Sequence, residues 1–409
     1  MQLPVFNKHY LCAPVGAKSN ECLTTWQVLL AGPLNLREKQ LIMSKHGRVL
    51  VAMSGGIDST VTAMILHEQG YEVVGITMKT WDYANSGGSK KETGCCSLDS
   101  INDARKVAVD MGFPHFIIDI REEFGDHVID NFVDEYMAGR TPNPCVLCNT
   151  HIKWSALLKR ADAMDCEFIA TGHYAQLNES DTGRWNVRKS ADSNKDQSYV
   201  LWGLSQECMA RSRFPLGHMT KPEVRQLAYD WGHEELSKKA ESFEICFVPD
   251  NDYRGFLKRR LPDLEAKVTG GNFVSVEGKK MGKHAGYPFY TIGQRKGLGI
   301  AFGEPMYVTK IDAATNEVTL GRLDDLVRNG MMVGGATLQK YTELPAEGME
   351  FTTKVRYKDA GTLSLVEQIS PDRFSVDFFA EVRGVAPGQS AVFYEGDDVV
   401  GGGLIHASR

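Results

Sequence analysis

The stretch Val51–Gly70, VAMSGGIDSTVTAMILHEQG, joins three kinds of sequence within twenty residues. An apolar, β-branched run leads into SGGIDS, and a run with helical spacing follows it. These patterns predict a buried strand before the glycines and a helix after them. Two glycines permit a tight turn, which brings backbone N–H groups together at the positive N-terminal end of the helix. The stretch therefore predicts a strand, an anion-binding turn and a helix.

The same alternation of strand-like and helix-like segments continues to about residue 173. Strands are expected at 48–53, 72–78, 115–120 and 167–173, and helices at 59–69, 100–111, 121–137 and 151–164. Alternation of this kind predicts a parallel sheet with helices on both faces. Ligands of such sheets bind beyond the carboxyl ends of the strands. SGGIDS, the Cys-rich loop 139–149 and the TGHY sequence at 171–174 should gather there.

The pattern changes twice further along the chain. Short helices rich in Lys and Arg follow residue 214, and short alternating segments separated by Gly, Asp and Asn follow residue 304, as in an antiparallel barrel or sandwich. The predicted fold class is α/β, with a parallel-sheet nucleotide-binding domain, a small mixed central domain and a C-terminal antiparallel β-barrel. The predicted bounds are an extension at 1–46, then domains at 47–213, 214–303 and 304–409. The extension is expected to be disordered or to result from a mis-assigned start, with Met43 as the natural one.

Composition narrows the class of protein. The chain has 42% hydrophobic residues, a net charge of −6 and nine cysteines in 409 residues. No apolar run approaches the ~18 residues that span a bilayer, and no signal peptide is recognisable. Nine cysteines are too few for a disulfide scaffold of this length. We therefore expect a cytoplasmic protein without a membrane segment, and a local excess of 17 Lys and Arg over 13 Asp and Glu at 195–300 permits a nucleic-acid face.

SGGIDS carries the side chains that a phosphate site needs. Ser54 and Ser59 can donate hydroxyl hydrogen bonds, and Asp58 could hold Mg²⁺ against the phosphates. The alternative is an ordinary strand–turn–helix connection with a serine cap. The whole string resembles the loop of the ATP pyrophosphatases, which cleave ATP between its α and β phosphates. Because no lysine stands in the Walker position, transfer of the γ-phosphate is not expected.

The cysteines are ambiguous when they are considered alone. Cys145 and Cys148 form a Cys-x-x-Cys pair that fits half a zinc site, a redox pair or chance, and no second such pair exists to complete a zinc site. Cys148 is expected just before a helix, where the helix N-terminus would lower the pKa of its thiol. Cys246 by itself would more often be a buried core thiol than a nucleophile.

Taken together, these strings resemble one family, the tRNA-specific 2-thiouridylases. The resemblance rests on AMSGGIDS, GRTPNPCVLCN, ATGHYA, SNKDQSYVLWGLS, KKAESFEICF, YTIGQRKGLGI, KVRYKDAG and GQSAVFYEGDDVVGGG, in this order from about residue 48 to the C-terminus. It implies a sulfurtransferase that adenylates O2 of the wobble uridine of tRNA and then replaces this oxygen with sulfur. Cys148 matches the nucleophile of the family and Cys246 its persulfide carrier.

The resemblance also implies binding residues, cofactors and partners. ATP would lie on Ala52, Met53, Ser54, Gly55, Gly56, Ile57, Asp58 and Ser59, with Met78 and Gly172 near the adenosine. The tRNA would contact Asn143, Pro144, Cys145, Lys195, Asp196, Gln197, Arg356 and Tyr357. Mg²⁺ would accompany ATP, and a cysteine desulfurase or a sulfur-relay protein would deliver the sulfur. We expect a monomer.

One residue departs from the pattern of the family. Cys145 stands where the familiar form has an aspartate that is a candidate general acid/base. The substitution leaves this role vacant, or gives it to the thiol, to water or to another residue. It also makes Cys145, Cys148 and Cys246 three thiolates that could hold an iron–sulfur cluster with one iron open.

Two other classes of protein remain in competition at this point. A synthetase of the argininosuccinate, GMP or NAD type would share the loop but attack with nitrogen and need no cysteine pair. A non-catalytic tRNA-binding or sulfur-relay protein would have no use for SGGIDS. His173, in TGHY, suits either bracing of the nucleotide loop or acid–base work.

Overall fold

The computed structural model describes residues 45–81, 97–239, 245–248, 250–301 and 303–409. Nearly all of the predicted extension 1–46 lies outside these residues, as do Cys95 and Cys96. No helix in the described ranges is long and apolar enough to cross a membrane.

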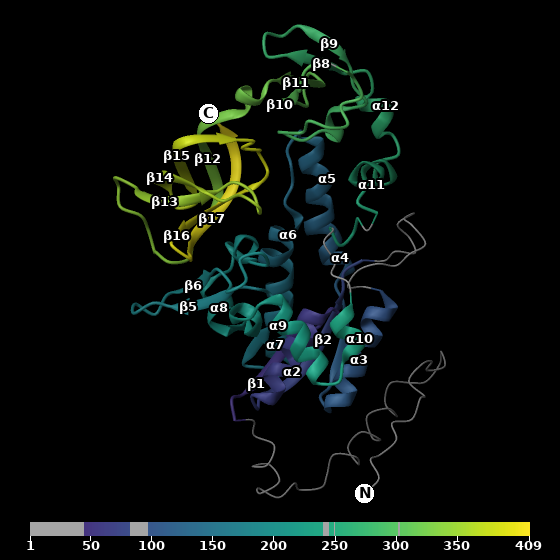
Figure 1. Ribbon diagram of the computed structural model, residues 1–409, viewed down its shortest axis with the longest axis vertical. Helices are drawn as coiled ribbons and strands as arrows, with labels where there is room; N and C mark the ends of the chain where they lie inside the picture. Colours follow the sequence, from purple (N-terminus) through teal and green to yellow (C-terminus); the bar gives the residue numbers. More distant parts are fainter. Residues whose placement is uncertain (1–44, 82–96, 240–244, 249, 302) are drawn as a thin grey trace, which may run out of the picture. The chain divides into compact units, whose positions relative to one another are not determined.

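A parallel sheet forms the N-terminal part of the structure (Figure 1). Its strand order is β3-β2-β1-β4-β7, and each adjacent pair runs parallel. The strands are β1 (Arg48–Ala52), β2 (Glu72–Lys79), β3 (His115–Asp119), β4 (Phe168–Ala170) and β7 (Ser212–Arg213). Four of the five coincide with the strands expected from sequence, so that the predicted α/β class is confirmed.

Strand β1 shows why helices cover both faces of this sheet. Alternate residues of a strand point to opposite faces. Val49 and Val51 are buried with α2 (Ile57–Glu68) and α3 (Leu98–Met111), whereas Leu50 is buried with Trp154 of α7 (Trp154–Ala163). Because both faces of the strand are covered, it has a continuous apolar sequence rather than an alternating one.

The central part of the chain combines short helices with a small sheet. The helices are α8 (Gln206–Arg211), α9 (Lys221–Asp230), α10 (Glu234–Lys238), α11 (Tyr253–Arg260) and α12 (Leu264–Val268). Val224 and Ala228 of α9 are buried with Ile57 and Val61 of α2, so α9 packs against the helix that follows SGGIDS.

The small sheet has the order β10-β11-β8-β9. Its strands are β8 (Asn272–Ser275), β9 (Lys280–Lys283), β10 (Tyr307–Asp312) and β11 (Glu317–Gly321). The β10–β11 hairpin follows residue 304, so the sequence pattern predicts that it belongs to the barrel. In the structure β11 instead pairs in parallel with β8, which places the hairpin in the small sheet. The bounds of the domains remain predictions.

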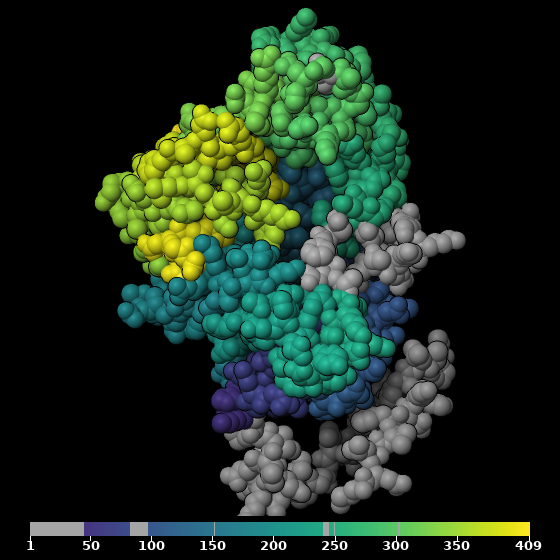
Figure 2. Space-filling view, in the orientation of Figure 1, coloured from purple at the N-terminus to yellow at the C-terminus, as the bar shows by residue number. Residues whose placement is uncertain are grey.

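The C-terminal strands close into the expected antiparallel barrel. They are β12 (Val327–Leu338), β13 (Met349–Lys354), β14 (Thr362–Ser370), β15 (Arg373–Arg383), β16 (Ser390–Glu395) and β17 (Asp398–Ser408). Strand β12 pairs with both β15 and β17, which closes the sheet. The barrel forms the yellow and yellow-green surface in Figure 2. A hairpin of the N-terminal part, β5 (Gln176–Glu179) and β6 (Trp185–Arg188), joins the sheet beside β17.

Candidate active site

SGGIDS forms a tight turn between β1 and α2. The Ser59 hydroxyl accepts a hydrogen bond from the Ser54 backbone N–H at 3.0 Å and lies 3.1 Å from the Ser54 hydroxyl. Gly55 has a φ of +70°, and a Cβ there would lie 1.9 Å from the Ser100 carbonyl oxygen. Glycine is therefore required at this position both for its backbone conformation and for the close approach of α3.

The TGHY segment after β4 touches the same turn. A Cβ on Gly172 would lie 2.7 Å from the Asp58 carbonyl carbon and from the Ser59 backbone nitrogen. A glycine at 172 thus lets two loops, which follow neighbouring parallel strands, meet at the carboxyl edge of the sheet.

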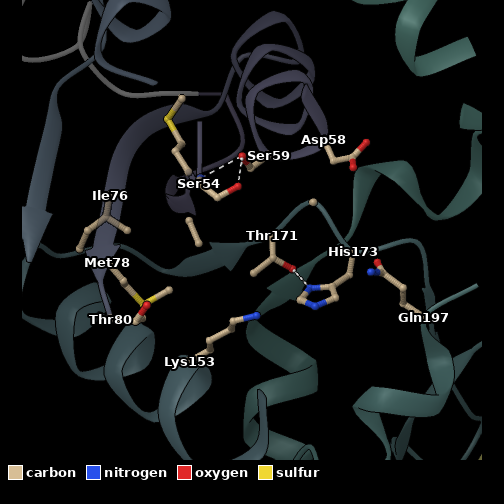
Figure 3. Close-up of a pocket in the computed structure, with 13 residues that line it drawn as sticks. Ser54, Asp58, Ser59, Ile76, Met78, Thr80, Lys153, Thr171, His173 and Gln197 are labelled. Atoms are coloured by element: carbon tan, nitrogen blue, oxygen red, sulfur yellow. Dashed lines mark hydrogen bonds between the residues drawn. The ribbon is translucent and has the colours of Figure 1, made fainter. Parts of the chain in front are cut away.

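These loops border a pocket with a free volume of about 230 Å³ (Figure 3). It is lined by Ala52, Met53, Ser54, Asp58, Ser59, Ile76, Met78, Thr80, Lys153, Thr171, Gly172, His173 and Gln197. Seven of the ten residues expected to bind ATP lie in this lining, whereas Gly55, Gly56 and Ile57 do not. Gln197, expected at the tRNA, also lines the pocket.

Sequence reasoning missed part of the lining, although a signal for it was present. Ile76, Met78 and Thr80 are spaced by two residues along and just after β2, so they share one face of the sheet. Because Met78 was expected beside the nucleotide, this spacing would also have predicted Ile76 and Thr80 in the lining. Lys153 had no such signal, because it reaches the pocket from the π-helical segment η3 (Cys148–Lys153).

His173 is held as a neutral side chain. Its Nδ1 lies 2.7 Å from the Thr171 hydroxyl, and its ring packs against Trp154 and Phe214. Burial, and then the nearby Lys153 cation, lower the pKa of His173 to about 3. An imidazole with so low a pKa is both a poor general acid and a weak general base at neutral pH. Together with the contacts that hold the ring, this favours bracing of the loop over acid–base work.

Asp58 lines the pocket, and its carboxylate is hydrogen-bonded to two side chains, those of Tyr174 and Lys221. Its carboxylate accepts a hydrogen bond from the Tyr174 hydroxyl at 2.8 Å. The ammonium of Lys221 donates to both of its oxygens, at 2.7 and 2.9 Å. Among the described residues that line the pocket, Asp58 is the only one with a carboxylate.

The helix around the Cys-x-x-Cys pair begins earlier than expected. Pro144 is the first residue of α6 (Pro144–Leu147), and the Asn143 side chain caps it by accepting from the Val146 N–H. Cys148 follows as the first residue of η3, which runs on into α7. The expectation that Cys148 precedes a helix is therefore wrong, and it is Cys145 that lies in the first turn. The order Asn then Pro was the available signal, because proline favours the first helical position.

The two thiols of the pair have different surroundings. Cys148 is buried, in the same cluster of side chains as Phe247. Cys145 reaches solvent, yet protein surrounds it closely enough that desolvation raises the pKa of its thiol, while Lys153 acts in the opposite direction.

Cys246 is exposed and adjacent in sequence to Phe247. Within the described residues, no three His, Cys, Asp or Glu side chains come together as a metal site. The ligand set of three cysteines considered from the sequence is thus not assembled in this conformation.

The residues expected at the tRNA come from two parts of the fold. The Asp196 carboxylate accepts hydrogen bonds from the backbone N–H groups of Ser190 and Ser198, which shapes the segment that carries Lys195. Tyr357, 41% exposed, belongs to the barrel and packs edge-on against Tyr199 of the N-terminal part.

The groups that act electrostatically on Tyr357 include a residue of the cysteine loop. Burial raises the pKa of its hydroxyl, and the neighbouring Asp196 and Cys145 raise it further. Arg356, beside it in sequence, is exposed. Tyr357 therefore approaches Cys145 from the barrel side, and Lys153 links Cys145 to the nucleotide pocket.

A parallel sheet with a Gly-Gly phosphate loop after its first strand, followed by a closed antiparallel barrel, defines a nucleotide-binding enzyme of the PP-loop class. Three family models match the chain: a tRNA methyl transferase HUP domain at residues 47–250, a tRNA methyl transferase PRC-barrel domain at 254–322 and an aminomethyltransferase beta-barrel domain at 336–405.

Relatives similar over nearly their full length carry a more specific name. The tRNA-specific 2-thiouridylase of Cytophaga hutchinsonii is 63% identical over 90% of this chain and 99% of its own. That of Amoebophilus asiaticus is 63% identical over 89% and 96%, and that of Salinibacter ruber 57% identical over 89% and 95%. The chain belongs to the tRNA-specific 2-thiouridylase family. The methyl-transfer wording of the two domain models is not shared by these relatives.

Proposed function

We propose that the protein is an ATP-dependent sulfurtransferase that replaces O2 of the wobble uridine of tRNA with sulfur. The proposal rests first on identity with full-length relatives of this family. The nucleotide pocket supports the ATP-dependent half of the proposal, and the cysteines at positions 148 and 246 support the sulfur-transfer half.

In the first half-reaction, uracil O2 attacks the α-phosphate of ATP. An O–P bond forms, the bond to the β-phosphate breaks and pyrophosphate leaves. The backbone N–H groups of the SGGIDS turn and the Ser54 and Ser59 hydroxyls would hold the phosphates at the N-terminus of α2. The AMP ester makes the carbonyl oxygen a good leaving group.

In the second half-reaction, Cys246 carries the incoming sulfur as a persulfide. The Cys148 thiolate attacks the inner sulfur, so that a Cys148–Cys246 disulfide forms and hydrosulfide is released. The hydrosulfide attacks C2 of the uracil, the C–O bond breaks and AMP leaves. An external thiol then reduces the disulfide.

The wobble base must leave the anticodon stack to reach this chemistry. Asn143, Pro144 and Cys145 would flank the base, and Tyr357 offers an exposed aromatic ring beside them for stacking. Lys195, Asp196, Gln197 and Arg356 would contact the rest of the tRNA. Cys145 would stand in for the aspartate of the familiar form.

Mg²⁺ would enter with ATP. Magnesium in proteins is commonly held by one or two carboxylates together with substrate phosphates, and Asp58 at the pocket wall fits this role. The ion would offset phosphate charge. We further propose a cysteine desulfurase or sulfur-relay protein as the sulfur donor, a monomeric enzyme and a cytoplasmic location.

The test is nucleoside mass spectrometry of tRNA incubated with enzyme, ATP and a persulfide donor. Cys148→Ser and Cys246→Ser should each reduce 2-thiouridine formation at least a hundredfold, because each removes one partner of the sulfur transfer. Cys208→Ser is the matched control, since Cys208 is a free thiol on α8, away from the pocket lining.

Pyrophosphate release separates this function from its rivals. Both serine variants should still release pyrophosphate when tRNA is present, because the first half-reaction uses neither thiol. Full thiolation by either variant would contradict the proposal. Stoichiometric iron and sulfide in anaerobically purified, active enzyme would replace the persulfide route with the cluster route.

A further inference from the structure

Lys221 is a buried lysine directed at the phosphate loop from far along the chain. Only 6% of the residue is exposed, and its ammonium contacts both oxygens of Asp58, a residue 163 positions away. Lys221 is the first residue of α9, the helix that packs on α2. It does not belong to the lining of the nucleotide pocket.

Several contacts fix the position of this ammonium. The Lys221 backbone N–H donates to the Asp192 carboxylate at 3.0 Å. Thr220 and Glu223 form a capping box at the start of α9. The ammonium also lies 5.7 Å from the centre of the Tyr174 ring, whose hydroxyl shares Asp58 with it. The cation is therefore built into the fold rather than resting on a flexible surface chain.

The negative charge of Asp58 gives the Lys221 ammonium a consequence for ATP binding. The phosphate loop itself contains no basic residue, and Asp58 places a negative charge on the wall of a site that must accept the negative charge of ATP. Like charges at close range in a partly desolvated pocket repel strongly. An unpaired carboxylate at this wall would thus oppose ATP binding.

We propose that Lys221 is a positioning residue for ATP that acts through Asp58. Its ammonium balances the carboxylate and, with the Tyr174 hydroxyl, holds it in one orientation, so that the wall of the phosphate site is close to neutral before any metal arrives. The inference rests on the ATP-binding part of the proposed function and is independent of the sulfur chemistry.

Equilibrium binding of the non-cleavable analogue α,β-methylene-ATP to the full chain, measured calorimetrically in EDTA, tests this role without turnover or metal. Lys221→Met should weaken binding at least tenfold, because it leaves the Asp58 charge unpaired. Asp58→Asn removes the carboxylate itself and serves as the background for the second comparison. The double variant Lys221→Met/Asp58→Asn should bind within about threefold of Asp58→Asn alone, because Lys221 has no carboxylate left to balance.

Lys238→Met is the matched control. Lys238 lies on α10, is 71% exposed and pairs with Glu234. The same loss of one positive charge there should leave the affinity unchanged. Lys221→Gln, which keeps polarity but not charge, serves as the second variant if Lys221→Met does not fold, and it should weaken binding by a similar factor.

Three outcomes would overturn the inference. They are wild-type affinity in a folded Lys221 variant, a loss in Lys238→Met as large as that in Lys221→Met, and a double variant weaker than Asp58→Asn by the factor that separates Lys221→Met from the wild type. The last outcome would mean that Lys221 acts on the phosphates directly. Failure of the proposed function would differ, because wild-type protein would then bind the analogue without producing 2-thiouridine.

Discussion

At the residue scale, burial sets the protonation of His115 on β3. Its Nε2 lies 2.9 Å from the Thr77 hydroxyl, which itself donates to the Met53 carbonyl, and its buried Nδ1 has no hydrogen-bond partner. A second proton would therefore place an unsatisfied N–H in the interior. Desolvation and, after it, Arg105 lower the pKa of His115 to about 4.

The protein should consequently lose stability on mild acidification. The pKa of His115 is lower in the folded than in the unfolded chain, so the unfolded chain binds the proton first as the pH falls from 6.5 towards 4. His115→Gln removes this contribution, which is roughly 1 kcal/mol at pH 5.5. The fall in Tm between pH 7.5 and 5.5 should be smaller in this variant. His218→Gln, at an exposed position, should retain the wild-type fall, and an equal fall in all three proteins would contradict the assignment.

Gly172 gives a second prediction at this scale. A methyl group there meets the backbone of the phosphate turn, which cannot swing aside as a flexible side chain could. Gly172→Ala should lower the affinity for ATP at least tenfold and reduce the Tm. Gly125→Ala adds the same methyl group where nothing lies within 4 Å. It should lower neither the affinity for ATP nor the Tm. Wild-type ATP binding by Gly172→Ala would show that the two loops need not touch.

At the element scale, the barrel holds the loop that precedes the Cys-x-x-Cys pair. The Gln389 side chain, just before β16, donates to the carbonyls of Thr141 and Pro142 at 3.1 and 2.9 Å. The Thr141 N–H donates in return to Pro387 at 2.9 Å. Through these bonds the barrel fixes the approach to Asn143 and Cys145.

Gln389→Ala should therefore impair tRNA thiolation while leaving ATP affinity intact. Two carbonyls lose their donor and the loop loosens, so we expect kcat/KM for tRNA to fall about tenfold, a transition-state cost of about 1.4 kcal/mol. Gln368→Ala is the control, because Gln368 bonds Leu344 within the barrel alone. Equal losses in both variants would assign the effect to general destabilisation of the barrel.

The positions of helices and strands were more predictable from the sequence than the contacts between them. The pattern of hydrophobic residues identified β1, β2, β3 and β4, because each is a short apolar run flanked by turn residues. The pairing of β11 with β8 could not be deduced, since strands with similar patterns compete for partners and the choice depends on long-range packing. The contact of Lys221 with Asp58 was inaccessible for the same reason, as nothing local to α9 indicates the phosphate loop.

At the scale of the whole molecule, one hydrophobic core serves two domains. Leu50 of β1 and Trp154 of α7 are buried in the same cluster as Val392, Tyr394 and Val399 of the barrel. The Tyr199 hydroxyl donates to the Ser390 carbonyl at 2.8 Å across the same junction. The nucleotide-binding sheet and the barrel should therefore not open independently, which suits a reaction that needs ATP, cysteines and the tRNA-facing residues together.

Two valine truncations in the barrel test this coupling. Val399 and Val366 are both fully buried, but Val399 belongs to the shared core and Val366 to a cluster made of barrel residues. Truncation of either to alanine should cost about 2 kcal/mol through lost packing. By hydrogen exchange, Val399→Ala should reduce amide protection in β1 and β6 as well as in β17, because the cavity lies between the domains. Val366→Ala should reduce protection in the barrel and leave β1 unchanged. If the effect of Val399→Ala stopped at the barrel strands, the two domains would have separate cores in energetic terms, and the expectation that they do not open independently would be wrong.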